Sequence, residues 1–224
     1  MYKAFIFDLD GTLVDTINYI AVNFNKVLEM EGFPPNPSDL YNTLVGDGTR
    51  ILAERAIDLL IKKGEVNPSQ REEVIEKVHD NYLYRYRTVV DDISKPYEGI
   101  VEVLETLRNK GIKIAICTNK PVTPTEIVLK EAFDFTFDAV SAVEEGGPRK
   151  PDPKMVEAIL KDLNIRKEEA LYLGDTSTDM ITGKNAGLDT VGVTWGFRDR
   201  AELESYKPLK VIDKPYEMLE FIEK

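Results

Sequence analysis

Residues 3–12 read Lys-Ala-Phe-Ile-Phe-Asp-Leu-Asp-Gly-Thr, and this stretch decides the fold that we expect. The apolar run over residues 3–8 is typical of a short strand that is buried on both faces. Asp8 and Asp10 stand at its carboxyl end, where Gly11 and Thr12 provide a turn. The two carboxylates either belong to an ordinary acidic turn or reach together into one cleft, and the rest of the chain must decide between these interpretations.

Further apolar runs alternate with segments of helical spacing along the rest of the chain. We expect strands at residues 112–117, 137–141, 170–173 and 189–193. Thr123 and Glu126 form a capping-box pattern at one helix start, and Asp152 before a proline marks another. This alternation predicts an α/β fold with a Rossmann-like parallel sheet and helices on both faces. Ligands of such sheets bind beyond the carboxyl ends of the strands.

Residues 16–92 interrupt the alternation. Their apolar residues follow helical spacing, with a loop over residues 32–37, and no strand pattern appears among them. We therefore expect an α-helical cap domain over residues 16–92, inserted after the first strand. The catalytic α/β core would then comprise residues 1–15 and 93–224.

Composition limits the classes of binding partner and the kind of metal that the chain could bind. The formal charge of −11 argues against a nucleic-acid partner, because phosphate backbones are bound by clustered Lys and Arg. No apolar run approaches the length of a membrane span and no leader precedes the first strand, so we expect a soluble cytoplasmic monomer or homodimer without a membrane partner. The chain has one His and one Cys, His79 and Cys117. A metal would therefore be held by oxygen ligands, which favours Mg²⁺.

Polar side chains follow the other expected strands at the same edge of the sheet. Thr118 and Asn119 come after one strand, and Asp175 and Asp179 follow another, while Lys150 precedes a helix. These groups suit phosphate and metal chemistry, and their number makes the acidic pair after the first strand a candidate active site. Two interpretations stay open, since Lys150 could be an ordinary surface lysine and Asp179 a first-turn helix acid.

At this point the chain resembles the haloacid dehalogenase superfamily over nearly its whole length. The four motifs of that superfamily stand in order as Asp8-Leu9-Asp10-Gly11-Thr12, Thr118, Lys150, and Gly174-Asp175 with Asp179. The resemblance implies that Asp8 attacks phosphorus to give an aspartyl-phosphate and that Asp10 serves as acid and then as base.

The resemblance also assigns the binding groups. It implies that Mg²⁺ is held by Asp8, the backbone carbonyl of Asp10 and Asp175, with Asp179 as a ligand or an orienting group. Thr118, the Asn119 N–H and Lys150 would bind the non-bridging phosphate oxygens. Two roles stay open for Lys120, because its side chain could be solvated or could contact the substrate.

A glycine-rich loop in the expected cap bears on the substrate. Residues 46–56 follow the pattern Gly-x-Gly-x-x-x-Leu-x-x-Arg-Ala, which resembles the cap loop of the phosphoglycolate phosphatase subgroup. The loop and helix start either bind an anion or serve folding only. The resemblance implies a small phosphorylated metabolite, 2-phosphoglycolate, whose carboxylate is read by the cap, with Gly48 and Arg50 as candidate contacts.

Two other enzyme classes and a binding protein are the alternatives to a phosphatase. Asp10 argues against a metal-free dehalogenase, which would not use a second aspartate two positions after its nucleophile. A sugar phosphomutase of the β-phosphoglucomutase kind stays open, because such an isomerase usually carries an arginine near the position of Arg50 for its distal phosphate. A non-catalytic binding protein would have no need of the complete set of acids and lysine.

Overall fold

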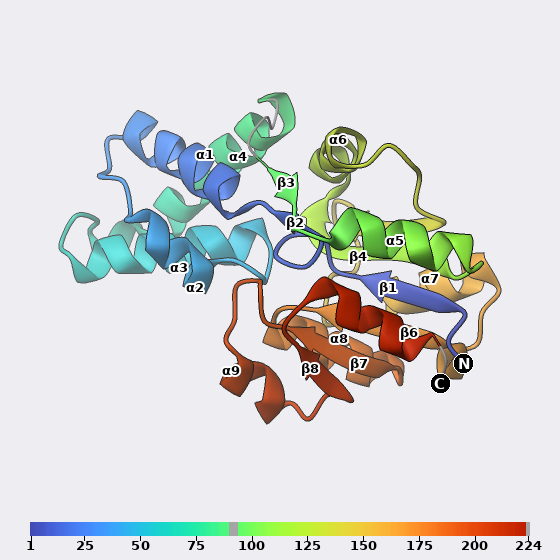
Figure 1. Cartoon of the computed structure of the whole chain (residues 1–224). Coiled ribbons are helices and arrows are strands. Elements are labelled where there is room, and N and C mark those ends of the chain that lie inside the picture. The colour runs from blue at the N-terminus through green and yellow to red at the C-terminus, as the bar shows by residue number, and fades with distance from the viewer. Residues whose placement is uncertain (90–93, 223–224) are drawn as a thin grey trace.

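Six parallel strands form one sheet in the order β5-β4-β1-β6-β7-β8 (Figure 1). The computed structural model describes residues 1–89 and 94–222. The sheet strands are β1 (Ala4–Phe7), β4 (Lys113–Pro121), β5 (Ala139–Val143), β6 (Ala170–Gly174), β7 (Asp189–Val193) and β8 (Lys210–Ile212). The helices of this part are α5 (Ile100–Asn109), α6 (Val122–Ala132), α7 (Lys154–Leu163), α8 (Ser177–Ala186) and α9 (Arg200–Ser205).

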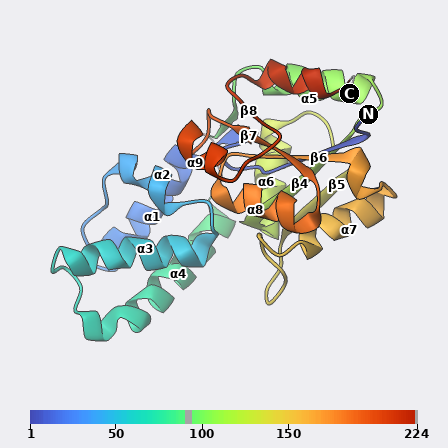
Figure 2. The ribbon, with the colours of Figure 1, turned by 90° about the horizontal axis from the view of Figure 1, so that it is seen from below.

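Strand β1 lies inside the sheet and is buried over its whole length. Phe5 and Phe7 pack into one apolar cluster with α5 and the C-terminal segment Pro215–Phe221. Ala4 and Ile6 pack on the opposite face, against α7. Figure 2 shows these two helical layers on either side of the sheet. The uninterrupted apolar run of β1 is therefore explained by burial on both faces, as in other parallel sheets.

The expected α/β fold is confirmed, with two local differences. Helix α6 begins at Val122 with Pro121 at its N-cap, so the expected cap at Thr123 was wrong. The reason is that β4 continues to Pro121 and leads into the helix without a loop. The other expected start is shifted by one residue, because α7 begins at Lys154 with Pro153 at its N-cap. The Asp152 carboxylate still accepts a hydrogen bond from the Lys154 N–H at 2.9 Å.

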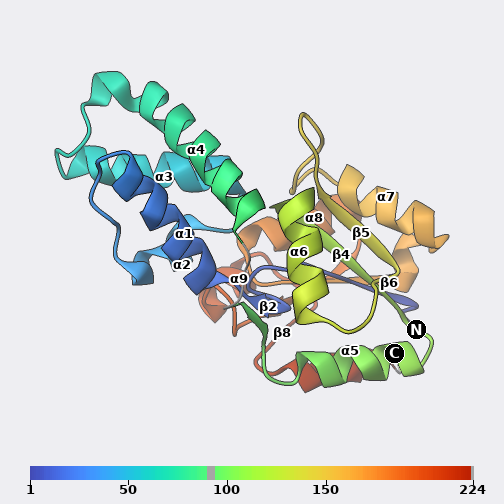
Figure 3. The same cartoon turned by 90° about the horizontal axis from the view of Figure 1, so that it is seen from above.

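A helical insertion lies between β1 and the rest of the core, and Figure 3 shows it beside the sheet. Its helices are α1 (Ile17–Met30), α2 (Tyr41–Leu44), α3 (Thr49–Lys62) and α4 (Arg71–Thr88). They enclose an apolar cluster of their own. We call this insertion the cap. Within the described residues, no helix is both long and apolar enough to cross a bilayer.

The chain enters and leaves the cap through a two-stranded antiparallel ribbon. Strand β2 (Val14–Asp15) pairs with β3 (Lys95–Pro96). The first expected boundary, between residues 15 and 16, falls at the end of β2. The second, between residues 92 and 93, lies outside the described residues, so the domain limits stay a prediction.

The cap cluster generates a test of cap stability. Phe24 of α1 is fully buried and its ring contacts those of Tyr41 and Tyr82, with centroids 6.1 and 5.0 Å away. We expect Phe24→Ala to lower the free energy of unfolding by about 3–5 kcal/mol, because the cavity it leaves cannot fully collapse. Urea unfolding measures this change.

The matched control is Val22→Ala on the same helix, where Val22 is 58% exposed. This substitution should change the free energy of unfolding by less than about 0.5 kcal/mol. Equal effects of the two substitutions would contradict the assignment of Phe24 to a packed cap core.

Candidate active site

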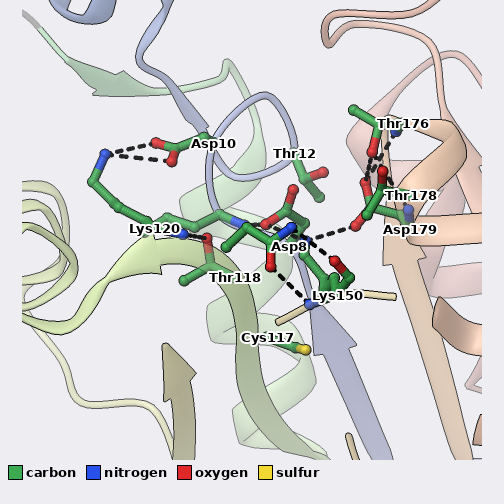
Figure 4. Close-up of polar contacts among 12 residues, drawn as sticks. Asp8, Asp10, Thr12, Cys117, Thr118, Lys120, Lys150, Thr176, Thr178 and Asp179 are labelled. Carbon is green, nitrogen blue, oxygen red and sulfur yellow. Dashed lines mark hydrogen bonds and ion pairs between the residues drawn. The ribbon is translucent and has the colours of Figure 1, made fainter. Parts of the chain in front are cut away.

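The carboxyl edge of the sheet gathers polar groups from three neighbouring strands (Figure 4). Asp8 follows β1 directly, Thr118 lies near the end of β4, and Asp175 follows β6 directly. The Asp8 N–H donates to the Leu173 carbonyl of β6 at 2.9 Å, which fixes the backbone at the point where β1 ends. Parallel pairing of these strands is what brings residues so distant in sequence to one place.

Lys150 lies at the centre of this group. Its Nζ is 2.8 Å from Asp8 Oδ1 and 2.8 Å from Asp179 Oδ1, and the residue is 3% exposed. The Asn119 side chain holds the Lys150 backbone, accepting from its N–H at 2.8 Å and donating to its carbonyl at 3.2 Å. Burial lowers the pKa of Lys150, but Asp179 and Asp8 outweigh burial and raise this pKa above its usual value. The surface-lysine interpretation is therefore wrong.

The positive charge near the carboxylates at this edge does not fully neutralise them. Burial raises the pKa of Asp8 to about 7, although Lys150 opposes this shift. Burial, followed by the charges of Asp179 and Asp8, raises the pKa of Asp175 well above its usual value. Both shifts report that the negative charge of these acids is incompletely balanced by the surrounding protein.

Asp175 is held by two loops. Its Oδ1 accepts a hydrogen bond from the Thr12 hydroxyl and its Oδ2 accepts one from the Phe197 N–H, both at 2.8 Å. The loop after β1 approaches so closely that a Cβ on Gly11 would lie 2.4 Å from Asp175 Oδ2. Gly11 also has a φ of 86°, a conformation that other residues rarely adopt. Glycine is required there by both the space and the backbone.

The two carboxylate oxygens of Asp179 accept hydrogen bonds from different partners. Its Oδ1 accepts from Lys150 and, at 3.3 Å, from the Tyr172 hydroxyl. Its Oδ2 accepts from the N–H and hydroxyl of Thr176, at 3.0 and 2.6 Å, in the capping box that begins α8. The helix-acid interpretation thus holds for Asp179, and the same side chain also lies among the site carboxylates.

A hard divalent cation fits this donor set. One carboxylate oxygen from each of Asp8, Asp175 and Asp179 lies within 4.8 Å of the others, and all three residues are buried. Oxygen donors of this kind are those that Mg²⁺ prefers. A bound cation would also offset the charge that raises the pKa values of Asp8 and Asp175.

Asp10 faces a different partner from the other acids. Its two carboxylate oxygens accept from Lys120 Nζ at 2.9 and 3.3 Å. Lys120 also donates to the Tyr86 hydroxyl of cap helix α4, and its Nζ lies 4.6 Å from the centroid of that ring. The Lys120 side chain is 1% exposed, so of the two open interpretations the solvated side chain is wrong. Tyr86 was not predicted as a site residue. Its i, i+4 spacing from Tyr82 signals a buried helix face but not its contact with the core.

A cavity of about 50 Å³ lies between the cap and the strand ends. This is room for a few water-sized groups. The core contributes one part of the wall, with Asp8, Asp10, Thr118, Asn119, Lys120 and Phe197. The cap contributes the other, with Ile20, Val45, Gly46, Gly48, Thr49, Leu52, Tyr82 and Tyr86. The arrangement leaves room for a small group next to Asp8 and Asp10.

The two cap residues expected to contact substrate are placed differently. Gly48, the N-cap of α3, lines the cavity. Arg50 does not line it. Its guanidinium pairs with Glu54 at 3.2 Å, with Glu76 at 3.4 Å and with Glu72. The structure therefore brings Gly48, but not Arg50, to the residues at the strand ends.

Comparison with known proteins supports the family that the motifs indicate. The chain is 33% identical over 213 residues to a phosphoglycolate phosphatase of Agrobacterium fabrum, covering 93% of this chain and 87% of that protein. It is 32% identical over 219 residues to the pyrophosphatase PpaX of Bacillus thuringiensis, covering 96% and 93%.

Comparison with solved structures supports the same family. A crystal structure from Lactobacillus delbrueckii subsp. bulgaricus matches with a TM-score of 0.89 and 27% identity, covering 99% of this chain and 98% of that one. The family model of the haloacid dehalogenase-like hydrolases matches residues 5–193. The chain belongs to the haloacid dehalogenase-like hydrolase family.

Proposed function

We propose that this protein is a magnesium-dependent phosphatase that hydrolyses a small phosphomonoester, 2-phosphoglycolate, through an aspartyl-phosphate. The observation that carries the proposal is the buried Asp8 carboxylate, which lines the cavity beside Lys150 and the other site acids. The phosphoglycolate phosphatases and the pyrophosphatase among its relatives support a phosphorylated substrate.

The first half of the reaction transfers the phosphoryl group to the protein. A carboxylate oxygen of Asp8 attacks phosphorus, and its new P–O bond forms as the bond to the leaving oxygen breaks. Asp10 gives its proton to that oxygen, so the product leaves as an alcohol. The Thr118 hydroxyl, the Asn119 N–H and the Lys150 ammonium balance the charge on the non-bridging oxygens.

The second half releases phosphate. Asp10, now a carboxylate, removes a proton from a water molecule whose oxygen attacks phosphorus. The bond between phosphorus and Asp8 breaks, and Asp8 returns to its starting form. The cap wall of the cavity keeps bulk water away during the first half, so that transfer to Asp8 precedes transfer to water.

Mg²⁺ would be held by the carboxylates of Asp8 and Asp175 together with the Asp10 backbone carbonyl. When bound, it supplies positive charge that offsets the phosphate oxygens and the buried acids. Asp179 keeps the Lys150 ammonium beside Asp8 through its 2.8 Å contact. It thus orients a phosphate-binding group whether or not it also contacts the metal.

Replacement of the nucleophile tests the chemistry. We expect Asp8→Asn to lower phosphate release by at least about 10³-fold, because an amide cannot form the covalent intermediate. The control is Asp39→Asn, an exposed acid in the turn Ser38–Leu40, which should retain the activity of the unmodified protein. Turnover of Asp8→Asn near that level would refute the mechanism.

Metal binding can be measured apart from activity. We expect saturating Mg²⁺ to raise the melting temperature by about 5 °C, because ligand that binds only the folded state stabilises it. Asp175→Asn should lose most of this increase, and potassium chloride at equal ionic strength should not reproduce it. An unchanged Mg²⁺ effect in Asp175→Asn would exclude Asp175 as a ligand.

EDTA should abolish phosphate release, and added Mg²⁺ should restore it.

The alternative isomerase is tested by its product. A phosphomutase would use Arg50 for the distal phosphate, but the Arg50 guanidinium is paired with three glutamates outside the cavity. This placement supports hydrolysis. Incubation with β-glucose 1-phosphate should therefore give no glucose 6-phosphate. Accumulation of glucose 6-phosphate without free phosphate would favour the isomerase.

A further inference from the structure

The cavity has a cation on the side where a leaving group would lie. Among the described residues that line it, Lys120 is the one Lys or Arg. The facing cap wall is largely uncharged, with Ile20, Val45, Leu52 and Tyr82. A leaving group in this cavity therefore meets apolar and aromatic surface on one side and a buried ammonium on the other.

Lys120 depends on Asp10 for a counter-charge. The ammonium donates to both Asp10 oxygens and to the Tyr86 hydroxyl, and its side chain is 1% exposed. A buried cation without an anionic partner is strongly unfavourable. Because Lys120 also lines the cavity, an anion bound there would share the ammonium with Asp10 and Tyr86.

We propose that Lys120 recognises a second anionic group on the substrate, a carboxylate attached to the carbon that bears the phosphate ester oxygen. This inference rests on the proposed function and adds the residue that selects the substrate class. The substrate carboxylate joins Asp10 as an anionic partner of the Lys120 ammonium. Tyr86 holds the ammonium in place from the cap.

Recognition of the second anion then lies on the core and not on the cap loop. Arg50, the candidate contact in that loop, has its guanidinium outside the cavity, paired with glutamates of α3 and α4. Lys120 comes from β4, two residues after Thr118. The group that binds the phosphate and the group that binds the carboxylate are thus carried by the same strand.

Two substrates isolate this interaction. In 2-phosphoglycolate a carboxylate occupies the position of the methyl group of ethyl phosphate, and the phosphate ester is otherwise the same. The experiment measures phosphate release with Mg²⁺ and compares kcat/KM for the two compounds. Because both are assayed on one preparation, their ratio is independent of the fraction of protein that is folded.

We expect the unmodified protein to prefer 2-phosphoglycolate and Lys120→Met to lower this preference by about 10- to 100-fold, the range for loss of a charge-assisted contact. Lys120→Arg should retain most of the preference, because it keeps the charge. Tyr86→Phe keeps the buried charge and the ring, and should lower the preference by about two- to tenfold. Lys154→Met, at a lysine whose side chain is 73% exposed, should leave it unchanged.

The direction of the change separates this role from a merely supporting one. If Lys120 only oriented Asp10, its loss would harm ethyl phosphate at least as much, since ethanol is the poorer leaving group. An unchanged or increased preference in Lys120→Met would therefore overturn the inference while phosphate release by the unmodified protein upholds the phosphatase. No release from either compound by the unmodified protein would instead refute the proposed function.

Discussion

The buried contact of Lys150 with Asp8 and Asp179 is the interaction on which the site depends. Three buried carboxylates lie within 4.8 Å of one another, and like charges so close repel strongly in a poorly solvated place. Lys150 offsets part of that repulsion at two of them, and Asn119 fixes its backbone through a pair of hydrogen bonds. The charge that remains is the reason a divalent cation suits the site.

Much of the core could be predicted from sequence because burial on both faces leaves a clear pattern. The run Ala4–Phe7 is apolar at every position, and each position packs against a helical layer or a neighbouring strand. Strand β8 escaped prediction, since three residues are too few to show a pattern. The false helix start at Thr123 has another cause. A local capping pattern cannot report that β4 runs directly into α6.

The candidate site, too, could be predicted from the sequence only in part. Asp8, Thr118 and Asp175 were found because their positions at strand ends are legible in sequence. The Lys120–Tyr86 contact was not, because its partners stand 34 residues apart on core and cap, and only the docking of α4 brings them together. Arg50 shows the opposite failure. Its loop suggested an anion site, yet two of its three glutamate partners come from the neighbouring helix α4.

The antiparallel ribbon of β2 and β3 places the entry to the cap beside the return from it, since Asp15 pairs with Lys95. The insertion is therefore closed at its base, and the sheet pairs its strands without using any cap residue. Evolution could exchange the cap for another of different shape while the strand ends kept their acids and lysines. The fold thus separates the part that carries the site acids and lysines from the part that forms the other wall of the cavity. Lys120 connects the two, because it belongs to the sheet but borders that space.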